Sequence, residues 1–356
     1  MRKIFVAGIG AVSPAGWNVA ALRAALGKNE PLPVQTMARP GWEKPLRVRL
    51  VPNPPVRPEF LAHPRLRRTS PITHYAAAAA LEAVAGLRAN PATKNLRMGI
   101  VVCLQSGCVQ YSCRFYDETL KNPATASPLV FPETVYAAPA SHVAALLENV
   151  VLAYSLVGDP SAFLQGVALG AEWLAENRVD ACLVIGAEET NWIIADALRL
   201  LDRPAIVAAG AGALCLCREP KFSAGIELAA ITDAHTFSAR LNRLQAAHAM
   251  RHQLGKNSTG ELLCDGIGDN PRTDAAERAA WNDWTNARIS PKQILGEGLM
   301  AAAAWQCVAA CDAVAEKKFV AVSVSMVGSN QQAIGARFVR ADFDLSAATP
   351  TGNIRP

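Results

Sequence analysis

The chain has 356 residues, of which 51% are hydrophobic and 18% charged, and its formal net charge is +5. These values describe a globular protein with a large core and exclude a disordered chain. The densest basic cluster, Arg65, Arg67 and Arg68, has no interleaved aromatic residues, so we expect no nucleic-acid groove.

Nine cysteines occur without a C-x-x-C pair or a zinc-ligand spacing, so we expect no metal site. Cys182, Cys215 and Cys217 lie in apolar runs, which is typical of reduced, buried thiols and indicates the cytoplasm. No stretch is long and apolar enough to predict a membrane span, and the first residues lack the apolar core of a signal peptide.

The first half of the chain alternates predicted strands with predicted helices. Continuous apolar runs predict buried strands, and helical spacing predicts amphipathic helices. The expected strands cover 3–11, 98–104, 181–185 and 213–218, and the expected helices cover 18–26 and 75–87. The Pro-rich residues 30–64 are predicted to form an irregular surface segment.

After a break near 219–223 a similar alternation begins again. It predicts strands at 224–233, 319–327 and 333–340, with helices around a loop over 283–315. Apolar strands that alternate with helices indicate a parallel sheet covered on both faces. The repetition also hints at two similar halves.

A strand-to-helix turn at 155–164 organises the chain. Asp159 has the side chain of an N-cap and Pro160 the fixed φ of a first helical residue, so we expect a helix from 160 to about 176. Its faces are nearly all apolar, which predicts a buried helix. The N-terminus of such a helix is where an enzyme lowers the pKa of a nucleophile or binds an oxyanion.

Six stretches follow one another in an order that one protein family shares. They are Phe5–Gly16, Arg114–Glu118, Ser127–Thr134, Ala138–Ala144, Val179–Glu188 and Val324–Asn330. Together they resemble the β-ketoacyl synthases of the thiolase superfamily. The resemblance implies an α/β, thiolase-like layered αβαβα fold built from two similar halves, 1–220 and 221–356.

The catalytic positions of that family carry other residues here. The resemblance places Pro160 at the nucleophilic cysteine, Asp265 at the first histidine and Glu297 at the second, while Lys292 matches the family's lysine. A gapless alignment puts Gly266 in place of Asp265. Without a thiol no acyl-enzyme forms, and carboxylates accept hydrogen bonds where imidazoles would donate them.

Two interpretations of these residues remain open. In the first, Asp159 caps its helix and Lys292 pairs with Glu297. In the second, Asp159, Asp265 and Glu297 form a carboxylate cluster for acid/base or metal chemistry. No histidine joins such a cluster, and His142 is predicted to be an ordinary polar partner at a helix start.

A ketosynthase-like sequence that lacks the catalytic triad is typical of chain-length factors. This chain most resembles the chain-length factors of type II polyketide and aryl-polyene systems. The resemblance implies a heterodimer with an active β-ketoacyl-ACP synthase, contact with acyl carrier protein through that complex, and no cofactor. The interface segment is 109–145. Its candidate tunnel and interface residues are Tyr111, Phe115, Tyr116, Phe131, Thr134, Val135, Tyr136 and Ala137.

Two other functions remain as alternatives. One is a ketosynthase-fold enzyme of altered chemistry that uses Asp265 and Glu297. The other is a stand-alone scaffold that binds carrier protein through the basic surface around Arg65, Arg67 and Arg68.

Overall fold

The computed structural model describes residues 3–201, 204–238, 242–255, 260–268 and 270–342. Its α-helices are α1 Val19–Lys28, α2 Pro71–Arg88, α3 Val109–Lys121, α4 Ala138–Leu147, α5 Ala162–Ala175, α6 Trp192–Leu201, α7 Arg243–Leu254, α8 Pro271–Ala280, α9 Pro291–Leu295 and α10 Met300–Ala315. Its strands are β1 Phe5–Val12, β2 Gln35–Met37, β3 Leu46–Arg49, β4 Met98–Leu104, β5 Val150–Val157, β6 Ala181–Glu188, β7 Val207–Ala208, β8 Gly210–Cys217, β9 Ile226–Ile231, β10 His235–Thr236, β11 Leu262–Cys264, β12 Arg288–Ile289, β13 Ala321–Val327 and β14 Gln332–Arg340.

The large sheet contains the same strand pattern twice. Its order is β12-β11-β13-β14-β9-β1-β8-β6-β4-β5. β4 runs parallel to β5 and β6, β6 antiparallel to β8, and β8 antiparallel to β1. In the same way β11 runs parallel to β12 and β13, β13 antiparallel to β14, and β14 antiparallel to β9. This repetition confirms two similar halves, which a short β1–β9 ladder joins. The boundary at 220/221 stays a prediction, and residues 343–356 of the second half lie outside the described residues.

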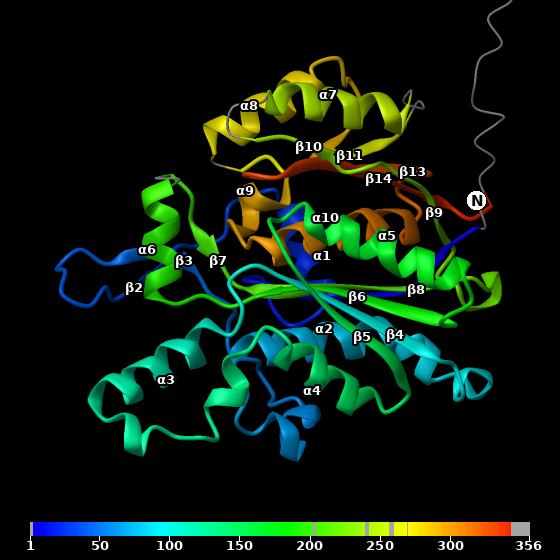
Figure 1. Ribbon diagram of the computed structural model, residues 1–356. Coiled ribbons are helices and arrows are strands. Elements are labelled where there is room, and N and C mark those ends of the chain that lie inside the picture. The colour runs from blue at the N-terminus through cyan, green and yellow to red at the C-terminus, as the bar shows by residue number, and fades with distance from the viewer. Residues whose placement is uncertain (1–2, 202–203, 239–241, 256–259, 269, 343–356) are drawn as a thin grey trace, which may run out of the picture.

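The elements stack in the five layers that the sequence predicts (Figure 1). α2 packs against β1, β6 and β8 on one outer face, beside α4. α10 lies in the middle, against β6 and β8 on one side and against β13 and β14 on the other. α7 covers β14 on the opposite outer face, next to α8. The α/β layered fold is therefore as expected.

The middle layer is thin because small side chains meet there. α10 is rich in alanine and is buried over nearly its whole length. A Cβ at Gly186 would lie 2.6 Å from the carbonyl oxygen of Met300, and one at Gly212 would lie 2.8 Å from the Cβ of Ala304. These distances are shorter than van der Waals contact, so glycine is required for the helix to approach the sheet.

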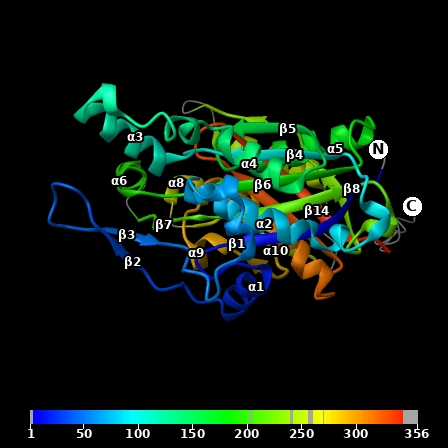
Figure 2. The ribbon, with the colours of Figure 1, turned by 90° about the horizontal axis from the view of Figure 1, so that it is seen from below.

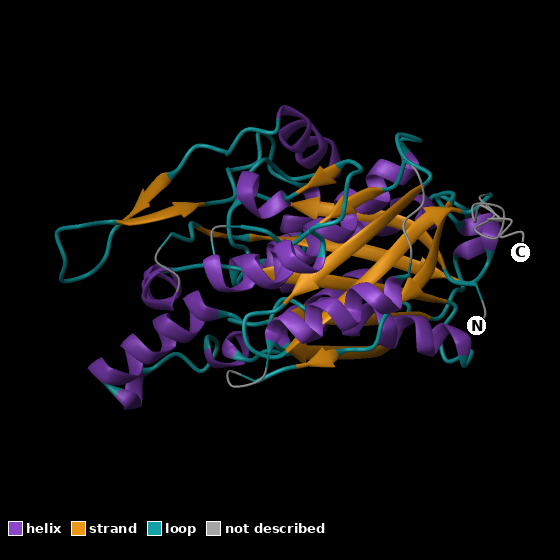
Figure 3. Cartoon of the chain, turned by 90° about the horizontal axis from the view of Figure 1, so that it is seen from above, coloured by secondary structure: helices purple, strands orange, loops and turns teal. Residues whose placement is uncertain are grey.

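Three predictions about the elements are wrong in detail. The sheet is mixed and not parallel, since β8, β1, β14 and β9 join it antiparallel. Residues 30–64 contain β2 and β3, which form a small sheet with β7 and project from the body (Figures 2 and 3). The alternating residues Leu46 and Val48 pack there against α6, a contact that the many prolines obscure in the sequence. Residues 283–290 are not helical but contain β12.

Most other predicted ranges agree with the structure to within a few residues, and 98–104 coincides with β4.

In the described part of the chain, no helix has both the length and the apolar character that a bilayer crossing needs.

Candidate functional site

The turn between β5 and α5 holds a buried carboxylate. Asp159 is 4% exposed, and its Oδ1 accepts a hydrogen bond from the backbone N–H of Ser161 at 3.2 Å and another from the Ser161 hydroxyl. Its Oδ2 accepts from the backbone N–H groups of Asn330 and Gln331 at 3.3 and 3.1 Å. A Cβ at Gly328 would lie 2.1 Å from that oxygen, so the loop can approach only as glycine. Asp159 therefore joins the turn to the loop after β13.

The same turn corrects the predicted helix start. α5 begins at Ala162, two residues later than the prediction, and Ser161 is its N-cap residue without a side-chain cap. Asp159 accepts hydrogen bonds from the turn and from the distant loop instead of capping the first helical turn. Pro160, between Asp159 and Ser161, is buried.

The turn offers no activated nucleophile. Pro160 has neither a thiol nor a hydroxyl, and the Ser161 hydroxyl, which donates to Asp159, is fully buried and out of reach of a substrate. All nine cysteines are free. Burial raises the pKa of the thiols of Cys108 and Cys113, and raises it in the seven others as well. A raised thiol pKa disfavours the thiolate that acyl transfer needs.

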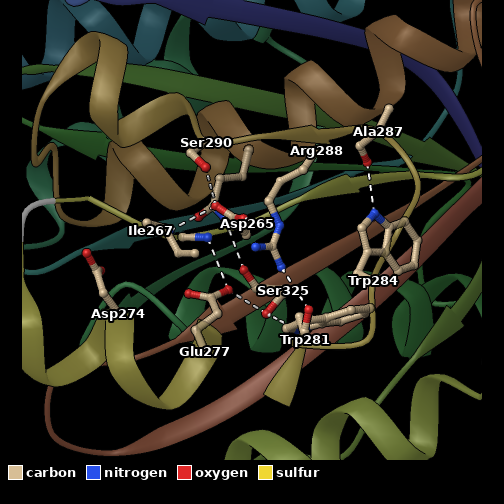
Figure 4. A network of polar contacts seen from close by, with 12 residues as sticks. Asp265, Ile267, Asp274, Glu277, Trp281, Trp284, Ala287, Arg288, Ser290 and Ser325 are labelled. Carbon is tan, nitrogen blue, oxygen red and sulfur yellow. Dashed lines mark hydrogen bonds and ion pairs between the residues drawn. The ribbon is translucent and has the colours of Figure 1, made fainter. Parts of the chain in front are cut away.

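Asp265 lies directly after β11 and is fully buried. Its Oδ1 accepts hydrogen bonds from the Ser290 hydroxyl at 2.7 Å and from the backbone N–H of Ile267 at 3.1 Å. Its Oδ2 forms an ion pair with Nε of Arg288 at 3.1 Å (Figure 4). Burial raises the pKa of Asp265, and the Ser290 hydrogen bond and the Arg288 charge offset this only in part.

Glu277 on α8 is a second buried carboxylate beside Asp265, and it was not among the predicted site residues. Its Oε1 accepts from the backbone N–H of Gly266 at 3.1 Å and from the Ser325 hydroxyl. Burial, together with the nearby Asp265 charge, raises the pKa of Glu277 to about 8. Figure 4 shows both carboxylates in one network with Trp281, whose indole donates to Ser325 at 3.0 Å. The signal in the sequence is the stretch 264–277, which resembles the family's first-histidine turn with the Asp and Glu that follow it, and which ends at Glu277.

Lys292 and Glu297 form the ion pair that the sequence predicts. Lys292 Nζ lies 2.8 Å from Oε2 of Glu297, and Oε1 of Glu297 accepts from the backbone N–H of Leu299 at 2.9 Å. Burial by itself lowers the pKa of the Lys292 amine. The attraction of Glu297 and of two further carboxylates more than offsets this, so the pKa is raised. The amine therefore stays protonated and neutralises Glu297.

The three positions thus have separate partners. Asp159 binds the loop after β13, Asp265 binds Arg288 and Ser290, and Glu297 binds Lys292. Within the described ranges, no group of three or more His, Cys, Asp or Glu side chains is arranged to hold a metal ion. The geometry gives no support to a joint carboxylate cluster.

The predicted interface segment lies on the surface. Tyr116 is 63% exposed on α3 and Phe131 is 55% exposed in the 3₁₀ helix Phe131–Thr134, whereas Tyr111 and Phe115 are half-buried. The rings of Phe115 and Phe131 lie 5.3 Å apart. Among the remaining candidates, Thr134 is half-buried, and Val135, Tyr136 and Ala137 are exposed. His142 pairs with Glu133 at 2.9 Å, which confirms its role as a polar partner.

Strand β5 continues this surface. It ends the strand order of the large sheet, so one row of its backbone N–H and C=O groups has no neighbouring strand among the residues that the structure describes. The side chains of Val151, Tyr154 and Val157 are each about half exposed. The Ser155 hydroxyl donates to the carbonyl of Tyr136 at 3.3 Å, which connects this strand to the interface segment.

Comparison with known proteins identifies the fold. No protein-family model and no curated protein sequence matches the chain. The structure of the ishigamide ketosynthase/chain length factor matches with a TM-score of 0.80 and 16% identity, over 95% of this chain and 99% of that chain. A β-ketoacyl synthase from Burkholderia phymatum matches with a TM-score of 0.79 and 16% identity, over 96% and 100%. The complex of the ketosynthase ApeO with its chain length factor ApeC from Xenorhabdus doucetiae matches with a TM-score of 0.78 and 13% identity, over 96% and 98%. The chain therefore has the thiolase-like fold of the β-ketoacyl synthases.

Proposed function

We propose that this chain is a non-catalytic chain-length factor that pairs with an active β-ketoacyl-ACP synthase. In that role it shapes the tunnel in which the partner extends a polyketide or polyene chain, and it meets the acyl carrier protein through the complex. The proposal rests on the turn before α5, where Asp159 already binds the nearby backbone N–H groups. Asp159 already accepts the backbone hydrogen bonds of Ser161, Asn330 and Gln331, and Pro160 provides no nucleophile. Donors that are already bound cannot stabilise a developing oxyanion.

The matched structures support the choice of partner. Two of them are described as a ketosynthase with a chain length factor, and a third, AntDE:AntF, as a type II acyl-carrier protein in complex with its ketosynthase. We extend these pairings to this chain as part of the proposal, together with the aryl-polyene subdivision and the division into halves at 220/221.

The exposed apolar surface supports a permanent partner. Tyr116, Leu120, Leu129 and Phe131 lie on or next to α3 and are each more than half exposed, and the edge of β5 adds further apolar side chains. Large apolar patches of this kind are costly in an isolated subunit. An open strand edge can pair with a strand of a second chain, which satisfies its backbone groups.

The rival function, altered chemistry at Asp265 and Glu297, has less support. Glu297 is held in an ion pair with Lys292, and a carboxylate held in an ion pair is a weak general base. Asp265 is fully buried, and its oxygens are already bound by Ser290, Ile267 and Arg288, so a substrate does not reach it. No observation in the described residues favours the stand-alone scaffold over the paired subunit.

Co-expression tests the pairing directly. Expressed alone, the chain should aggregate or remain largely insoluble, because its apolar surface stays exposed. Co-expressed with a co-encoded active ketosynthase, it should elute as a 1:1 heterodimer in size-exclusion chromatography with light scattering. A stable monomer or homodimer that ignores every such ketosynthase would contradict the proposal.

Enlarging a side chain of the interface segment should change the product. We expect Ala137→Trp to shorten the chains that the heterodimer makes without abolishing the partner's turnover, because bulk added to a tunnel wall stops extension earlier. Mass spectrometry of the products measures the shift. The matched control is Ala124→Trp, which adds the same bulk at an exposed site of the same segment and should leave chain length unchanged.

Restoring the family residues should not restore condensation. The variant Pro160→Cys/Asp265→His/Glu297→His should show no turnover of acyl and malonyl carrier-protein thioesters above background. Asp159 still occupies the loop amides in this variant, and catalysis requires sub-ångström placement of the reacting groups. Product formation by the purified triple variant would refute this expectation.

A further inference from the structure

A pocket of about 280 Å³ lies between α1, the C-terminal part of α10 and strands β11 and β12. It belongs to neither of the surfaces described above. Figure 2 shows α1 and β5 on opposite sides of the molecule. The pocket therefore stays accessible when a partner pairs along β5.

The pocket has an apolar interior. Its walls include Leu22 and Leu26 from α1, Ile289 from β12, Ala309 from α10, and Phe319. Small-molecule sites are lined mostly by apolar side chains with a few polar groups that fix orientation, and they begin at about this volume. The interior therefore fits the apolar body of a small ligand better than a sugar or a nucleotide.

The polar groups of the pocket select the charge of that ligand. Arg23 forms ion pairs with Asp312 at 2.6 Å and with Glu316 at 3.1 Å, so its charge is already compensated within the protein. Arg288 contacts Asp265 through Nε and the carbonyl of Trp281 through Nη2.

Lys318 differs from these two arginines. It lines the pocket, and among the described residues no carboxylate lies within ion-pair distance of its amine. The pocket thus combines an apolar interior with a cation that has no carboxylate partner among the described residues, and Asp312, the one acidic residue of its described lining, is already paired with Arg23.

We propose that this pocket binds a small amphiphilic carboxylate, a medium-chain fatty acid or an arylalkanoic acid, with the carboxylate at Lys318 and the apolar body between α1 and α10. Lys318 is exposed, so its charge-assisted hydrogen bond to the carboxylate is partly screened by water and gives selectivity for charge more than affinity. Burial of the tail against Leu22 and Leu26 supplies most of the remaining affinity. This site is independent of the pairing proposed above.

Calorimetric titration of the full-length chain with decanoate tests the proposal, with the chain in whichever form is soluble, alone or paired. We expect one equivalent of decanoate per chain. Lys318→Gln should weaken decanoate binding about threefold, the effect of losing one solvent-exposed ion pair. It should not change the weaker binding of decanol, which has the same tail without the charge. The control Lys28→Gln removes the same charge from a residue of α1 that does not line the pocket, and should have no effect.

A second variant tests the apolar part. Gly27 lines the pocket, and a Cβ there would meet no atom within 4 Å, so a side chain can begin at this position without displacing a neighbour, and Gly27→Phe adds a ring to the pocket lining. It should abolish the binding of both decanoate and decanol. The control Gly86→Phe, in α2, is equally free of neighbours and should leave binding intact. Decanoate binding that survives both Lys318→Gln and Gly27→Phe, or decanol binding as tight as that of decanoate, would overturn the proposal.

Discussion

Asp159→Ala should lose about 3 to 5 kcal/mol of unfolding free energy, the range for removing one partner of a buried charged network. The wild-type carboxylate accepts from three backbone N–H groups and one hydroxyl in a buried site. Alanine leaves those donors unsatisfied and places no atoms against Gly328. Denaturant unfolding measures the loss, with the same dependence of unfolding free energy on denaturant concentration used for both proteins. Hydrogen exchange of the backbone amides of Asn330 and Gln331 should also become faster in the variant.

Two controls separate this cause from general damage. Formate should partly restore the melting temperature of Asp159→Ala and leave the wild type unchanged, because a small carboxylate can occupy the vacated amides. Asp342→Ala removes an exposed carboxylate that pairs with Arg340 at the surface, and should change stability little. If the effect of Asp159→Ala were as small as that of the control, the turn and the loop would be held together by packing alone. The occupied amides would then no longer support the proposed loss of catalysis.

The elements that the sequence predicts well are those with a local cause. Strand β4, Met98–Leu104, is an unbroken apolar run because both faces of the sheet are covered, and its bounds match the prediction. The Lys292–Glu297 pair is predictable for the same reason, since the two residues are five positions apart in the sequence and Lys292 lies in the short helix α9 just before Glu297.

The features that the sequence does not reveal depend on distant segments. Asp159 looks like a helix cap when only its neighbours are considered, but the loop that binds it lies 171 residues away. β3 looks irregular because prolines surround it, and its strand depends on pairing with β2 and with the distant β7 and on packing against α6. Burial of Glu277 depends on β13 and on the turn after β11, so its charge state could not be anticipated from the polar character of α8.

Glu277→Gln should stabilise the protein at alkaline pH and have little effect in acid. The pKa of Glu277 is about 8 in the folded protein and about 4.5 in the unfolded chain, so the folded state binds the extra proton between these values. The favourable contribution of the protonated group is therefore complete below about pH 4.5 and is lost as pH rises through about 8. Glutamine cannot ionise, and its carbonyl oxygen can still accept from Gly266 and Ser325.

The measurement is the melting temperature of both proteins from pH 5 to pH 9. At pH 9 the variant should be more stable by an amount on the order of 2 kcal/mol, well below the full linkage value because Asp265 and Glu277 titrate together. The difference should shrink steadily towards pH 5. The matched control is Glu172→Gln on the exposed face of α5, which should follow the wild type at every pH. A stability difference that stays constant across the range would mean that Glu277 does not carry a proton in the folded protein, and that the Lys292 charge holds it ionised instead.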